Sequence, residues 1–126
     1  MNFPENLRYT KDHEWVRIDG DTGTIGITDY AQGELGDVVF VELPAVGKTV
    51  KQNEAFGTIE AVKAVSDLYA PVSGSVTEVN TILESQSELV NKDPYGKGWM
   101  IKIRLSKPDE VAALMSAESY KGLVAK

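Results

Sequence analysis

The spacing of short β-prone runs constrains the fold of this chain more than any other feature. Runs rich in Val, Ile, Thr, Tyr, Phe and Trp recur along the sequence, for example at 14–28, 38–44 and 100–105. Clusters of Gly, Pro, Asn and Asp separate them every eight to twelve residues or so. Many short strands joined by frequent turns are typical of a small β-sandwich or barrel. The sequence therefore predicts a mainly β fold.

Two segments carry helical signals instead. Residues 28–36 predict a short helix that is capped by Thr28 and ends near Gly36. Near the C-terminus, Ser106 is a suitable N-cap, and three apolar residues (Val111, Leu114 and Met115) follow at the spacing of one helix face. We therefore predict a helical segment over about 107–124 that covers the edge or end of a sheet, and one domain over residues 1–126.

Charge and cysteine content exclude several classes of function. Thirteen Lys and Arg against nineteen Asp and Glu give a net charge of −6, which disfavours binding to nucleic acid or to an anionic membrane. The chain has no cysteine, so disulfides and thiolate catalysis are excluded. It shows neither a signal peptide nor an apolar run long enough to span a bilayer. We expect a cytoplasmic monomer read from its own start codon.

The usual catalytic signals are weak. His13 is the only histidine, and no G-x-S-x-G nucleophile elbow accompanies it. A zinc site would have to be completed by carboxylates alone. The plain interpretation is a structural histidine, hydrogen-bonded at the start of a strand. We expect no metal site and no catalytic residue, so the chain is not expected to be an enzyme.

The stretch "IEAVKAVSD", residues 59–67, places Lys63 between two β-prone runs. Gly, Asn and Asp are the usual residues at such a turn. An exposed turn lysine that keeps a sheet edge in solution is one interpretation. A Schiff-base lysine is a second, but it requires a buried amine of lowered pKa, which a hairpin tip does not provide. A lysine displayed for covalent modification is the third.

Several ordered motifs make the choice among these interpretations more specific. The segments "YTKDHEWV", "GITDYAQGELGDVVFVELPAVG", "EAVKAVSDLYAPVSGSVTEVN" and "LVNKDPYGKGWMIKI" resemble, in this order, the H protein family of the glycine cleavage system. The resemblance extends almost from end to end. It implies a barrel-sandwich hybrid, the fold of lipoyl domains, with short helices and a C-terminal helix.

The same resemblance implies a carrier function. It places lipoic acid in amide linkage on Lys63, at the tip of a lipoyl hairpin over about 55–70. The arm would carry the aminomethyl group of glycine from the P protein, a pyridoxal-phosphate glycine decarboxylase, to the T protein, an aminomethyltransferase. The L protein, a dihydrolipoamide dehydrogenase, would reoxidise the dithiol.

Further residues follow from matching the family's motifs. Glu60, three residues before the lysine, matches the acidic residue recognised by the lipoylating enzyme, and Gly47 and Gly74 match two recognition glycines. Turn geometry alone also accounts for both glycines. Glu14 and Asp67 are candidates to line a cleft for the loaded arm, where a carboxylate would bind a cationic amine.

Other functions stay open at this level. An H-like carrier that relays lipoyl groups to other 2-oxoacid dehydrogenases would use the same surface. A biotin carrier is disfavoured because Val62 and Ala64, not methionines, flank Lys63. An enzyme with a Schiff-base lysine and an interaction protein with an unmodified lysine are the remaining alternatives.

Overall fold

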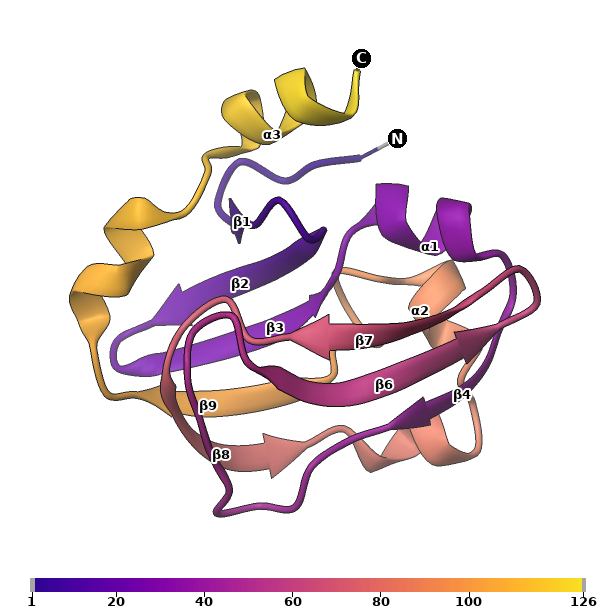
Figure 1. Cartoon of the computed structure of the whole chain (residues 1–126), viewed down its shortest axis with the longest axis horizontal. Coiled ribbons are helices and arrows are strands. Elements are labelled where there is room, and N and C mark those ends of the chain that lie inside the picture. The colour runs from indigo at the N-terminus through magenta and orange to yellow at the C-terminus, as the bar shows by residue number, and fades with distance from the viewer. Residues whose placement is uncertain (1, 126) are drawn as a thin grey trace.

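The computed structural model describes residues 2–125 and contains two antiparallel sheets (Figure 1). The six-stranded sheet has the order β1-β2-β3-β9-β8-β5. Its strands are β1 (Arg8–Tyr9), β2 (Glu14–Asp19), β3 (Thr22–Ile27), β5 (Thr49–Val50), β8 (Gly74–Val79) and β9 (Ile101–Leu105). The three-stranded sheet has the order β4-β6-β7. Its strands are β4 (Val38–Glu42), β6 (Ala55–Ala61) and β7 (Val65–Tyr69). The predicted mainly β fold is confirmed.

Short helices fill the connections and the C-terminal segment. They are α1 (Asp29–Leu35), η1 (Thr81–Glu84), α2 (Leu89–Lys92), η2 (Pro108–Ala113) and α3 (Ala117–Val124), where η marks a 3₁₀ helix. Within the described part of the chain, no helix is long and apolar enough to cross a membrane.

The two sheets face each other across the main hydrophobic core. The six-stranded sheet contributes Val16, Ile25 and Ile103, and the three-stranded sheet contributes Ile59 and Leu68. Each of these residues is at most 2% exposed. Alternation along the strands sends every second side chain into this layer, as the sequence pattern requires.

A second, smaller cluster holds the chain ends against the six-stranded sheet. It contains Leu7, Tyr9, Trp15, Ala117 and Tyr120. The Tyr9 and Tyr120 rings stack 4.8 Å apart, and the indole N–H of Trp15 donates to the Pro94 carbonyl. The helix α3 and the N-terminal segment therefore lie side by side (Figure 1).

The first predicted helix is confirmed in detail. The Thr28 hydroxyl accepts a hydrogen bond from the Ala31 N–H at the start of α1. At its other end Gly36 has a φ of +79°, and its N–H donates to the Gln32 carbonyl. Glycine is favoured there because an L side chain is strained at this φ.

The predicted cap and the continuity of the C-terminal helical segment are wrong, although η2 begins at Pro108, close to the predicted start. Ser106 caps no helix, and the backbone between 114 and 116 is extended between η2 and α3. Met115 exchanges two backbone hydrogen bonds with Tyr9, both 2.9 Å long. This bridge requires an extended chain, so it interrupts the helix that the apolar spacing alone predicts. The cap of α3 is Ser116, whose hydroxyl accepts from the Ser119 N–H.

Two glycine substitutions, one in strand β8 and one in helix α1, test how closely the chain is packed at each position. A Cβ at Gly74 would collide with the Arg104 carbonyl oxygen of the neighbouring strand. We expect Gly74→Ala to lower the free energy of unfolding by roughly 1–3 kcal/mol. A Cβ added at Gly33, inside α1, would meet no neighbouring side chain or strand within 4 Å. Gly33→Ala is therefore expected to stabilise by roughly 0.5–1 kcal/mol. Chemical denaturation measures both, and equal effects would contradict this packing.

Candidate functional site

The hairpin tip that carries Lys63 is held by backbone hydrogen bonds. The strands β6 and β7 pair antiparallel, and the Ala61 N–H donates to the Ala64 carbonyl across the tip. The Val62 N–H donates to the Asp37 carbonyl at 3.0 Å, and the Lys63 N–H donates to the Leu35 carbonyl at 3.1 Å. The tip is thus attached to the end of α1 and does not need a glycine.

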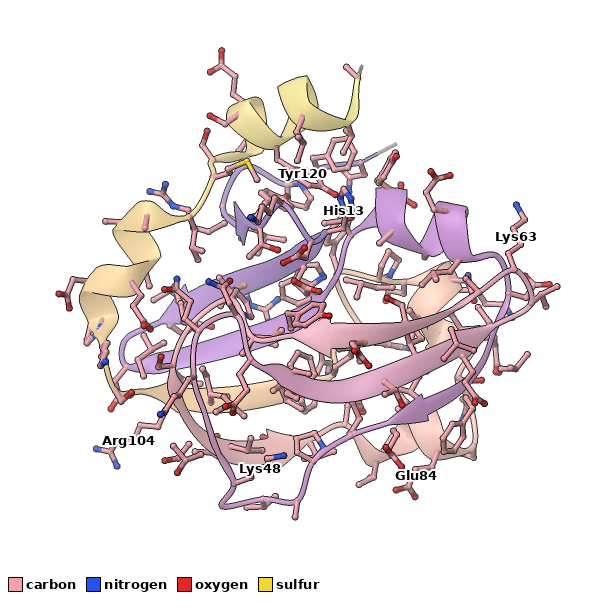
Figure 2. The ribbon with its side chains drawn as sticks, in the orientation of Figure 1. His13, Lys48, Lys63, Glu84, Arg104 and Tyr120 are labelled. Atoms are coloured by element: carbon pink, nitrogen blue, oxygen red, sulfur yellow. The ribbon has the colours of Figure 1, made fainter. Side chains whose placement is uncertain are left out.

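The Lys63 side chain leaves this fixed backbone for solvent. The residue is exposed, and its amine lies at the edge of the molecule, beyond α1 (Figure 2). The methylene stem passes over Gly36, where a Cβ would stand only 3.2 Å from Lys63 Cγ. An exposed amine has none of the desolvation that a Schiff-base lysine requires.

A cleft of about 260 Å³ lies between α1, β7 and the loop before β2. Its apolar wall is Ile27, Ala31, Leu35, Ile59 and Leu68. Its polar lining is Asp12, His13, Glu14, Tyr30, Glu34, Ser66 and Asp67. Leu35 connects the cleft to the tip, because this residue lines the cleft and its carbonyl accepts from Lys63.

The two acidic residues that the sequence analysis assigns to an arm cleft lie in this one cavity. Asp67 is exposed at the rim, and Glu14 is only 2% exposed. The Thr10 hydroxyl donates to Glu14 Oε1 at 2.9 Å, and the Tyr69 N–H donates to Oε2 at 3.3 Å. Burial outweighs these donors and raises the pKa of Glu14 to about 8.

Glu60 lies outside the cleft, on the outer face of the three-stranded sheet. It pairs with Phe40 on β4 and with Val65 on β7. Cross-strand partners place their side chains on the same face. Phe40 is 48% and Val65 is 69% exposed. The Phe40–Glu60–Val65 row is therefore an open surface beside Lys63, with one carboxylate between two apolar side chains.

The structure does not bring Gly47 and Gly74 to the lysine. Gly47 precedes Lys48, which lies far from Lys63 in Figure 2. Gly74 pairs with Val50 and lies close to the backbone of Arg104, a residue that Figure 2 shows far from Lys63. Gly47 has a φ of +96° and donates its N–H to the Val76 carbonyl. Turn geometry therefore accounts for Gly47, whereas Gly74 lies in strand β8 and requires glycine because a Cβ would collide with the Arg104 carbonyl oxygen.

His13 has a structural role and also belongs to the cleft. It precedes β2, and its Nδ1 lies 2.8 Å from the Tyr120 hydroxyl, as expected for a hydrogen-bonded histidine at a strand start. Its ring also lies 4.8 Å from the Tyr30 ring of α1. The sequence analysis missed Asp12, Tyr30 and Phe40 as site residues. All three lie inside the quoted motifs, but no local signal there marks Asp12 and Tyr30 as lining a cleft or Phe40 as exposed.

Comparisons with known proteins agree with the resemblance seen in the sequence. The family model described as glycine cleavage H-protein matches residues 7–126. This chain belongs to the glycine cleavage H-protein family. A glycine cleavage system H protein of Rubrobacter xylanophilus is 63% identical over 118 residues, which cover 94% of this chain and 91% of the relative.

Further members of the family align over similar lengths. The H protein of Symbiobacterium thermophilum is 59% identical over 119 residues, covering 94% of this chain and 93% of the relative. A crystal structure of the H protein from Mycobacterium marinum superposes with a TM-score of 0.89 at 41% identity, over 98% of this chain and 99% of that one. The lipoyl-domain-like fold implied by the resemblance is consistent with this neighbour.

Among residues 2–125, no group of three or more His, Asp or Glu side chains is placed to hold a metal ion. The cleft does fit an amphipathic arm attached at Lys63. Its apolar wall suits a hydrocarbon chain, and its acidic lining suits a cationic end. Lipoic acid with a bound amine has this chemistry.

The buried carboxyl group of Glu14 makes the stability of the protein depend on pH. Its pKa is higher in the folded chain than in the unfolded chain, so the unfolded state binds fewer protons between pH 5 and 8. Its contribution to stability is therefore present at low pH and is lost as the pH rises through about 8. We expect wild type to lose more stability than Glu14→Gln between these pH values.

Denaturant unfolding of both proteins at several pH values checks this expectation. The comparison concerns the pH dependence, because the amide in Glu14→Gln cannot accept from both Thr10 and Tyr69 and has its own constant cost. Parallel stability curves for the two proteins would show that Glu14 is not held neutral by burial.

Proposed function

We propose that this chain is the lipoylated carrier of glycine cleavage, with lipoic acid in amide linkage on Lys63. In this proposal it takes the aminomethyl group of glycine from the P protein to the T protein, and the L protein reoxidises it. The carrier works as a cytoplasmic monomer and catalyses none of these steps. The observation that supports the proposal most strongly is the exposed Lys63, fixed at the end of α1 beside an acidic cleft.

The bound group supplies the dithiol–disulfide pair that the cysteine-free chain lacks. The chain itself supplies the lysine for attachment, a fixed position for that lysine, and a cleft that can enclose the arm. Because the tip is hydrogen-bonded to Leu35 and Asp37, the attachment point is fixed while the side chain remains free to move. A tethered arm meets a docked partner at high effective concentration.

The ionisation of the Glu14 carboxyl group responds to a positive charge in the cleft. In the bare protein at neutral pH its carboxyl group is largely protonated, because burial raises its pKa to about 8. A cationic amine in the cleft would favour the ionised form and gain a charge-assisted hydrogen bond, with release of one proton. Asp67 lies at the rim of the cleft, and strand alternation places its side chain on the same outer face as Val65. Enclosure of the amine beside the buried Glu14 would limit its contact with water.

The Phe40–Glu60–Val65 row is the proposed surface for the lipoylating enzyme. An enzyme that acylates Lys63 must cover the neighbourhood of its amine, and this row is the open sheet surface there. The apolar members give it area to bury, and Glu60 gives it one charge to recognise. Gly47 and Gly74 lie away from this surface, so we propose that they act on lipoylation through the shape of the sheet.

Lys63→Arg tests the carrier function directly. Arginine keeps the charge but cannot form the lipoyl amide, so glycine-dependent CO₂ exchange with the P protein should be lost. The residue is exposed, so the free energy of unfolding should change by less than about 0.5 kcal/mol. Lys48→Arg, at another exposed lysine, is the matched control and should retain the exchange. Exchange by Lys63→Arg, prepared under conditions that lipoylate wild type, would refute the proposal.

Glu60→Ala tests recognition by the lipoylating enzyme. We expect kcat/KM for lipoylation to fall by roughly tenfold, the effect of about 1.4 kcal/mol of lost pairing with a cation on the enzyme. Glu42→Ala removes an exposed carboxylate from the neighbouring row of the same sheet face and should have little effect. Equal rates for the two variants would remove Glu60 from this role.

A further inference from the structure

A chain of hydrogen bonds connects three distant segments behind the cleft. The Thr28 hydroxyl accepts from the Ala31 N–H at 3.2 Å and lies 2.7 Å from the Tyr120 hydroxyl. The Tyr120 hydroxyl in turn lies 2.8 Å from His13 Nδ1. His13 belongs to the loop before β2, Thr28 caps α1, and Tyr120 comes from α3. Figure 2 shows His13 and Tyr120 next to each other between α1 and α3.

Burial fixes the direction of these hydrogen bonds. Thr28 and Tyr120 are both 0% exposed, so their hydroxyl protons have only each other and His13 as partners. Thr28 already accepts from a backbone N–H, and its own proton has one available acceptor, the Tyr120 oxygen. Tyr120 must then give its proton to His13 Nδ1.

The opposite direction of these hydrogen bonds leaves the buried Thr28 hydroxyl without an acceptor. If Nδ1 carried a proton and donated to Tyr120, the tyrosine would donate to Thr28, and the Thr28 proton would face no acceptor. An unsatisfied buried hydroxyl is disfavoured by about tenfold or more in population. The Nδ1 atom is therefore an acceptor, and the proton of the neutral ring is on Nε2.

We propose that Tyr120 is a positioning residue for the arm cleft, because it and Thr28 hold His13 in its neutral, Nε2-protonated form. His13 then offers the cleft a hydrogen-bond donor without adding a positive charge. The part of this proposal that concerns the arm rests on the proposed function. The hydrogen-bond chain itself does not.

The surroundings of His13 show why its charge matters. The groups that line the cleft with it are Asp12 and Glu14 near its own strand, Tyr30 and Glu34 on α1, and Asp67 on β7. None of the cleft-lining residues is Lys or Arg. A protonated His13 would be the one cation among these lining residues, in a cavity proposed to receive another cation. Burial lowers the pKa of His13, although the carboxylates of Asp12 and Glu34 act in the opposite direction.

The backbone of His13 is also constrained. Its φ is +70°, which is uncommon for a residue other than glycine. Its N–H donates to the Thr10 carbonyl, and its carbonyl accepts from the Thr28 N–H. These two backbone hydrogen bonds hold His13 in this conformation and so fix where its side chain leaves the backbone.

The single histidine makes a decisive measurement simple. Long-range ¹⁵N–¹H correlation spectra of the full-length, unmodified chain, labelled with ¹⁵N-histidine, contain one imidazole ring. At a pH where the ring is neutral, we expect a single tautomer with an acceptor-type Nδ1 and a protonated Nε2. A proton on Nδ1, or an average of both tautomers, would overturn the proposal without any variant.

Two tyrosine variants test whether Tyr120 is responsible. Tyr120→Phe removes the donor to Nδ1, so the Nδ1 resonance should move toward its free value and the pKa of His13 should rise. Tyr9→Phe is the control, because its ring stacks on Tyr120 while its hydroxyl donates to the Pro4 carbonyl. It should leave the His13 spectrum unchanged. A wild-type spectrum in Tyr120→Phe would overturn the positioning role.

A last comparison connects the chain of hydrogen bonds to the arm. In lipoylated, aminomethyl-loaded protein, Tyr120→Phe should shorten the lifetime of the loaded state near pH 6 more than near pH 9, because only the lower pH protonates the released histidine. Tyr9→Phe, which removes a hydroxyl that bonds to the Pro4 carbonyl and not to His13, is the control and should behave as wild type. If Tyr120→Phe shortened the lifetime of the loaded state equally at both pH values, or did not shorten it at all, the cleft role would be refuted. Failure of wild type to be lipoylated would instead refute the proposed function and leave the spectroscopic result standing.

Discussion

The two hydrogen bonds between the hairpin tip and the end of α1 are the constraint on which the site depends. The N–H groups of Val62 and Lys63 donate to carbonyls of Asp37 and Leu35, and these bonds join the two elements that border the cleft. They fix the Cα of the lysine while its side chain remains exposed. The left-handed Gly36 is part of the same junction, because any Cβ there would crowd the lysine stem. A rigid attachment point with a mobile side chain is what a carrier requires.

The cleft beside this junction has an apolar wall and a polar lining that includes a buried carboxyl group and a histidine ring. Glu14 is buried among them, and burial raises its pKa to about 8. Burial also lowers the pKa of His13, and in the proposed arrangement the Tyr120 hydroxyl, oriented by Thr28, favours the neutral ring further. The hydrogen bonds of Tyr120 bring the C-terminal helix α3 against the loop that carries His13 and the start of α1. The ends of the chain therefore contribute to the site and do not merely cover the sheet.

Much of the fold and part of the site could be predicted from the sequence. The alternating runs determined the strands, and Thr28 and Gly36 determined the first helix, because these signals act over a few residues. The prediction of one continuous C-terminal helical segment is wrong at 114–116, where a bridge to Tyr9 overrides the local apolar spacing. The contact of His13 with Tyr120 spans 107 residues and has no local signal. The positions of Gly47 and Gly74, away from the lysine, likewise depend on the sheet topology.

The central claim is that Lys63 carries lipoic acid, and one measurement tests it directly. Intact-mass analysis and peptide mapping of the protein purified from its native cell should show a single lipoyl group, located on Lys63. An unmodified Lys63, in a cell whose other lipoyl proteins are modified, would contradict the account. The exposed tip and the acidic cleft would then require a function without an arm.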